Sequence, residues 1–122
     1  MPPLHPIPLS LWRLAFALCL LTVFILALLP DPDPRLSTGW DKGNHLLAFA
    51  ALAFLGGAAR LVRRPTVALG LLGYGMLIEL LQGLSGYRFA EWADLLADGL
   101  GIGLGLAIHA ALCHVGRRIF QP

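Results

Sequence analysis

Four long runs of apolar residues, separated by short polar or proline-rich segments, dominate the pattern of this chain. They cover residues 11–29, 43–62, 66–84 and 92–113. An α-helix rises about 1.5 Å per residue, so a run of about 20 residues is as long as the hydrocarbon layer of a bilayer is thick. The pattern therefore predicts an all-α membrane protein, a compact bundle of four transmembrane helices that forms a single domain over residues 1–122.

The segments between the runs carry residues that end helices. Residues 1–10 hold four prolines, residues 30–35 alternate proline with charged residues, and Pro65 follows two arginines. Proline lacks the backbone N–H that a helix interior needs. A cleaved signal peptide is the alternative for the first run. That run is long for a signal peptide and ends in Leu-Leu-Pro without a small-x-small cleavage motif, so we expect it to be a retained span.

Composition supports the membrane assignment. Hydrophobic residues make up 57% of the chain and charged residues 13%, and the mean hydropathy is +0.75. This is far more apolar than a soluble domain, and membrane lipids are the expected surroundings. No feature of the sequence predicts a nucleic-acid partner. Cys19 and Cys113 both fall within apolar runs, where we expect cysteine to pack as a small hydrophobic residue.

Basic residues are distributed unequally between the two sides that a four-span topology would create. Cytoplasmic loops of membrane proteins carry the excess of Lys and Arg. Three basic residues fall on one side, Arg35, Lys42 and Arg88; six fall on the other, Arg13, Arg60, Arg63, Arg64, Arg117 and Arg118. The prediction is therefore that both termini are cytoplasmic.

Polar and ionisable residues inside the apolar runs or at their entries mark a candidate site. Asp41 and His45 are four residues apart, Glu79 and Gln82 are three apart, and Asp94 and Asp98 are four apart, so each pair shares a helix face. Charged groups within a membrane are costly and usually mark a functional site, although a satisfied polar network that only fixes helix register is the alternative. The residues expected to converge below the outer surface are Asp41, Lys42, His45, Glu79, Gln82, Arg88, Asp94 and Asp98.

Four glycines alternate with larger apolar residues in the last run. Gly99 and Gly103 are four residues apart, and so are Gly101 and Gly105, which makes two faces of small residues on one helix. Such faces let another helix approach closely. We expect close packing within the chain, against the second or third helix, and a homodimer face is the alternative.

The order of these motifs resembles the VanZ-like family of bacterial membrane proteins. The resemblance covers about residues 38–106 and lies in Asp41-Lys-Gly-Asn-His45, Ile78-Glu79-Leu-Leu-Gln82, Arg88, and Asp94-Leu-Leu-Ala-Asp98-Gly99. It implies a small multi-span protein of the bacterial cytoplasmic (inner) membrane, in a family whose founding member is associated with low-level teicoplanin resistance. One departure concerns Asp98, because asparagine is more frequent at that position in the family.

Two functional classes and a structural one follow. The first is an outward-facing polar pocket for an envelope lipid or a cell-wall-related or glycopeptide headgroup, with Arg88 and Lys42 holding an anionic group. The second is a membrane-embedded hydrolase or transferase acting on a lipid-linked envelope substrate, with His45, Glu79 and Asp94 as candidate catalytic residues. Asp41, Asp94 or Asp98 would then orient the base or hold a divalent metal. The third is a structural or assembly subunit. The sequence itself assigns no cofactor and no resident metal.

Overall fold

The computed structural model confirms the all-α prediction. It describes residues 7–29, 41–86 and 91–120, and within these ranges it contains four helices and no strand. The helices are α1 (Leu9–Leu28), α2 (Asp41–Ala59), α3 (Arg64–Leu84) and α4 (Trp92–Phe120). Helix α4 continues well beyond the predicted end at residue 113. Charged side chains do not end a helix, and Arg117 and Arg118 in its last turn interact favourably with the helix dipole.

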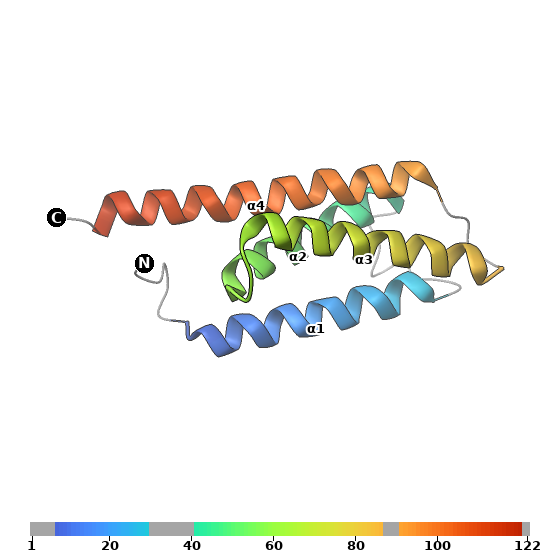
Figure 1. Ribbon diagram of the computed structural model, residues 1–122, viewed down its shortest axis with the longest axis horizontal. Helices are drawn as coiled ribbons and strands as arrows, with labels where there is room; N and C mark the ends of the chain where they lie inside the picture. The colour runs from blue at the N-terminus through green and yellow to red at the C-terminus, as the bar shows by residue number, and fades with distance from the viewer. Residues whose placement is uncertain (1–6, 30–40, 87–90, 121–122) are drawn as a thin grey trace.

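The helices run alternately up and down the bundle (Figure 1). The start of α1, the turn between α2 and α3 and the end of α4 lie at one end of the molecule. In that turn Arg60 has a left-handed backbone (φ 51°), and Pro65 then occupies the first turn of α3, where its missing N–H is not needed. The end of α3 and the start of α4 lie at the opposite end.

The core is formed mainly by α2, α3 and α4. Phe49 and Leu52 of α2, Leu71 and Ile78 of α3 and Ile102 of α4 are buried together. Helix α1 has no fully buried residue and packs against this core with partly buried side chains. Two hydrogen bonds also attach α3 to α1: the Tyr74 hydroxyl donates to the Leu20 carbonyl, and the Gln82 amide donates to the Ala27 carbonyl.

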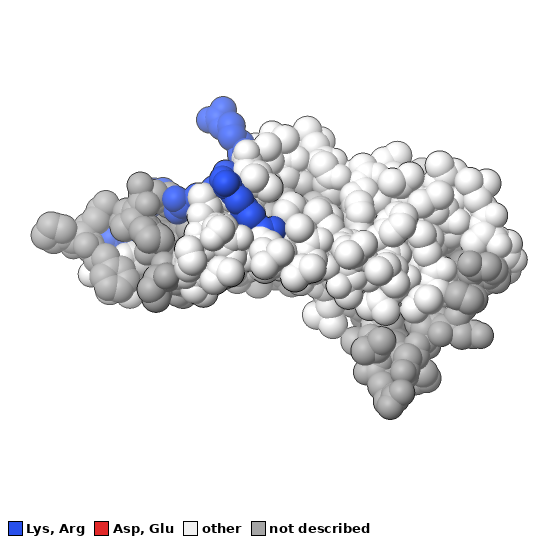
Figure 2. All heavy atoms as spheres, turned by 90° about the horizontal axis from the view of Figure 1, so that it is seen from below, with Lys and Arg blue, Asp and Glu red and all other residues white. Residues whose placement is uncertain are grey.

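Large apolar side chains cover the outside of the bundle. On α4 they form a continuous stripe that includes Leu96, Leu100 and Leu104, and on α1 Leu14 and Leu21 are more than half exposed. Figure 2 shows a face on which Lys and Arg gather toward one end and the rest of the described surface is uncharged. Among the described residues, three helices are long and apolar enough to cross a membrane: Leu9–Leu28, Arg64–Leu84 and Trp92–Ile119. These features support a membrane protein.

Helices α2 and α4 approach each other at two glycines. A Cβ atom at Gly101 would overlap the Leu46 carbonyl oxygen, and a Cβ atom at Gly105 would overlap the Ala50 carbonyl oxygen. The second glycine face is different, since a Cβ at Gly99 would meet only Leu72 at 3.8 Å and one at Gly103 would lie in open space. The small-residue face at Gly101 and Gly105 therefore packs against α2 within the chain.

Candidate functional site

Three carboxylates surround one histidine where α2, α3 and α4 meet. His45 lies in the second turn of α2, Glu79 near the end of α3, and Asp94 and Asp98 in the first turns of α4. The His45 Nδ1 atom is 2.7 Å from Asp98 Oδ1, and its Nε2 atom is 3.8 Å from Asp94 Oδ2 and 4.0 Å from Glu79 Oε1. We call these four residues the His45 cluster.

The cluster is buried. Asp98 is 0% exposed, Asp94 is 2% exposed and Glu79 is 8% exposed. Acidic side chains are almost never buried to this extent unless they are paired. The single imidazole lies close to all three carboxyl groups, so His45 is the centre of the arrangement.

The hydrogen bond between His45 and Asp98 fixes the orientation of the imidazole. If Asp98 is ionised, its carboxylate only accepts hydrogen bonds, so Nδ1 carries the proton and donates a hydrogen bond to Asp98 Oδ1. The opposite nitrogen, Nε2, then faces Asp94 and Glu79. A histidine held by a carboxylate in this way is suited to act as a base or to bind a metal through its other nitrogen.

Lys42 and Glu91 connect the cluster to the surface. The Lys42 ammonium lies 2.9 Å from Glu91 Oε2 and 3.9 Å from Asp94 Oδ1, and the Lys42 and Glu91 side chains are 37% and 50% exposed. The backbone N–H of Glu91 donates to Glu79 Oε2 at 3.0 Å, which ties the start of α4 to the end of α3. We refer to the His45 cluster together with Lys42 and Glu91 as the acidic end.

Two buried carboxylate oxygens in the cluster have no hydrogen-bond partner among the described residues, Glu79 Oε1 and Asp98 Oδ2. A Cβ at Gly75 would lie 2.8 Å from Asp98 Oδ2. The absence of a side chain at Gly75 therefore provides the space that this oxygen occupies. Most buried polar atoms in proteins are paired, so each unpaired oxygen needs an explanation. Both oxygens are acceptors, and what they lack is a donor or a cation.

Other residues predicted for the site lie apart from it or are not described. The Gln82 amide donates to the Ala27 carbonyl of α1 at 2.8 Å and so joins two helices outside the cluster. Arg88 and the side chain of Asp41 lie outside the described residues. Sequence reasoning missed Gly75, because a single glycine in a glycine-rich helix gives no sign of which neighbour it faces.

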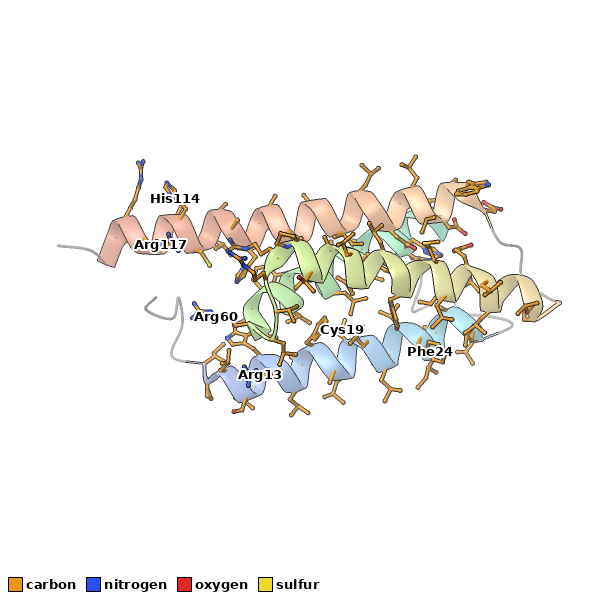
Figure 3. All side chains as sticks on the ribbon, in the orientation of Figure 1. Arg13, Cys19, Phe24, Arg60, His114 and Arg117 are labelled. Atoms are coloured by element: carbon orange, nitrogen blue, oxygen red, sulfur yellow. The ribbon has the colours of Figure 1, made fainter. Side chains whose placement is uncertain are left out.

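Another histidine, His109, is buried at the opposite end, among basic residues. Arg64 lies 3.4 Å from His109 Nδ1, Cys113 Sγ is 3.7 Å from His109 Nε2, and Phe54 contacts the ring edge-on at 5.5 Å. Arg13 donates to the Ala59 carbonyl at the same end, and Figure 3 shows Arg13, Arg60 and Arg117 there. The basic end is defined by six arginines, Arg13, Arg60, Arg63, Arg64, Arg117 and Arg118.

No family model, curated protein or solved structure matches this chain. The resemblance to the VanZ-like family therefore remains a hypothesis.

Proposed function

We propose that the chain is an inner-membrane protein of the bacterial envelope whose four helices all cross the bilayer, with the basic end in the cytoplasm. Three helices have the length and hydropathy to span. The first turns of α2 are polar, but the His45 side chain packs against α3 and α4 instead of facing lipid. The excess of arginine at the end where α1 begins supports a cytoplasmic N-terminus.

Cysteine labelling tests this topology. In a chain with Cys19 and Cys113 replaced by alanine, Trp92→Cys places an exposed thiol at the acidic end and Arg117→Cys places one at the basic end. A membrane-impermeant maleimide added to intact cells should label the first thiol and not the second. The reverse pattern, or labelling of both, would contradict the proposed orientation.

The function that the geometry supports best is binding of a polar headgroup, lipid-linked or cell-wall-related, at the acidic end. The observation that carries it is the pair of buried acceptor oxygens, Glu79 Oε1 and Asp98 Oδ2, without donors among the described residues. Lys42 is already paired with Glu91 and Asp94. The described groups therefore favour a headgroup that supplies donors, such as an amine or hydroxyls, over an anionic one.

Lipid retention measured by native mass spectrometry tests headgroup binding. Wild-type protein should retain phosphatidylethanolamine, whose headgroup carries an amine, more strongly than phosphatidic acid, whose headgroup is an anionic phosphate alone. Glu79→Gln should reduce this preference because it removes a charge that attracts the amine. Gly103→Ala, which adds a methyl group in open space, is the matched control. Equal retention of both lipids by a folded wild-type protein would remove the proposal.

The hydrogen bond between His45 and Asp98 favours a second candidate function, a membrane-embedded hydrolase or transferase acting on a lipid-linked substrate. Asp98 would orient the imidazole, and Nε2 would accept the proton of the attacking water or hydroxyl. Purified protein should then turn over an envelope lipid, and His45→Ala should abolish the reaction. Absence of turnover across a broad lipid panel, with and without divalent cations, would contradict this candidate.

A further inference from the structure

The donor atoms of the His45 cluster are close enough together to share one ion. His45, Glu79 and Asp98 each offer a ligand atom, and these atoms lie within 4.8 Å of one another. The Nε2 atom of His45 is also 3.8 Å from Asp94 Oδ2 and 4.0 Å from Glu79 Oε1. Ligand atoms of a tetrahedral ion with bonds of about 2.1 Å are about 3.4 Å apart. The two distances from His45 Nε2 to the carboxylate oxygens would each have to shorten by about half an ångström to reach that spacing.

The hydrogen bond on the far side of the imidazole is the arrangement that metal-binding histidines use. A histidine ligand usually donates its other N–H to a carboxylate, which fixes the tautomer and makes the ligating nitrogen more basic. Here Nδ1 donates to Asp98 Oδ1 at 2.7 Å, and Nε2 faces the other two carboxylates.

Charge at the acidic end also favours a cation. The described groups are four carboxylates, Glu79, Glu91, Asp94 and Asp98, against the ammonium of Lys42 and a histidine. If all four are ionised and His45 is neutral, an excess of three negative charges remains, most of it buried. Glu79 Oε1 is buried, lies in the cluster and has no hydrogen-bond partner among the described residues. A divalent cation would satisfy this oxygen and remove most of the excess charge.

We propose that His45 Nε2, Glu79 and Asp94 bind one divalent metal ion, with Asp98 positioning the imidazole through Nδ1. One imidazole and two carboxylates suit a first-row ion such as Zn²⁺ or Mn²⁺ better than Mg²⁺, which prefers an all-oxygen site with several waters. The inference adds a metal to the site of the proposed function, but metal binding does not require a headgroup ligand.

Calorimetric titration of the chelator-treated full chain in detergent tests the proposal. Zn²⁺ and Mn²⁺ are the probes, and Mg²⁺ is the comparison. Wild-type protein should bind a single Zn²⁺ or Mn²⁺ more tightly than Mg²⁺. Asp98→Asn should weaken binding by about 10- to 100-fold, as loss of an outer-shell partner does. His45→Gln and Glu79→Gln should weaken it further, because each removes a direct ligand.

A matched variant tests whether metal binds instead at the basic end. The double substitution of His109→Gln and Cys113→Ala removes the other neighbouring histidine and cysteine and should leave affinity unchanged. X-ray absorption of the Zn²⁺-loaded protein should show nitrogen and oxygen ligands and no sulfur. Sulfur ligation, or equal affinity in wild type and His45→Gln, would overturn the proposal.

Folding and lipid binding are followed separately from the titration. If Glu79→Gln weakens the metal-free fold, the comparison becomes the rise in melting temperature on adding Zn²⁺, which the wild type should show and the variant should lose. An unchanged rise in the variant would also overturn the proposal. Lipid retention is measured with and without Zn²⁺. Metal binding without a lipid preference would support the metal site and contradict the headgroup function. A lipid preference without metal binding would support the headgroup function and contradict the metal site.

Discussion

The two ends of the bundle use a histidine in opposite ways. His45 donates to a carboxylate and has two further carboxylates beside its other nitrogen. His109 accepts from the Arg64 guanidinium and packs edge-on against Phe54. A ring beside a guanidinium is held as a neutral acceptor, whereas a ring among carboxylates attracts a proton or a metal. The partners, more than the residue type, therefore decide which histidine belongs to a site.

Removing His45 should give the largest loss of stability. His45→Leu leaves three buried carboxyl groups without their common partner, and breaking a buried charge pair in this way costs about 3–5 kcal/mol. Reversible unfolding in mixed detergent micelles, followed by circular dichroism, measures the free energy of unfolding. A loss below about 1 kcal/mol would show that the carboxylates do not depend on the imidazole.

Substitution at the close contact between α2 and α4, which lies between the two ends, should give the next largest loss of stability. Gly105→Ala forces a methyl group against the Ala50 carbonyl oxygen, so we expect destabilisation of about 1–3 kcal/mol. Gly103→Ala is the matched control on the same helix, since it meets nothing within 4 Å and should be nearly neutral. Equal effects in the same unfolding assay would argue that the two helices separate easily.

Removing His109 should have a smaller effect than removing His45. His109→Leu loses a hydrogen bond and an aromatic contact, together worth about 1–2 kcal/mol, but Arg64 is exposed and water can solvate it. Unfolding measured beside His45→Leu sharpens the comparison between the ends. A loss as large as that of His45→Leu would show that the basic end depends on its histidine for stability as much as the acidic end does.

The ion pair at the rim of the acidic end should contribute least. Lys42 and Glu91 are both partly exposed, so Lys42→Met should reduce stability by less than about 1 kcal/mol. The loss should shrink further at high salt, because salt screens exposed charges. Unfolding at low and high ionic strength measures both effects. A large loss that salt does not change would place Lys42 inside the buried network.

Hydrophobic pattern predicted the fold well because helix length and polarity are local properties. The four runs became the four helices, and the main error was the end of α4, where basic residues were mistaken for a boundary. The site was harder to predict. Spacing places Asp94 and Asp98 on one helix face, but it does not fix the rotation of one helix against another. Sequence therefore could not show that Asp98 pairs with Nδ1 of His45, or that Gln82 turns toward α1.

The close crossing at Gly101 and Gly105 has a mechanical consequence. The backbones of α2 and α4 are in close contact at these glycines. His45 on α2 is therefore held at a fixed position relative to Asp94 and Asp98 on α4. Glu79 belongs to α3, which is attached to α1 through Gln82 and Tyr74. The distance between Glu79 and the imidazole therefore depends on how α3 packs against the bundle, whereas the distances from His45 to Asp94 and Asp98 depend only on the contact between α2 and α4.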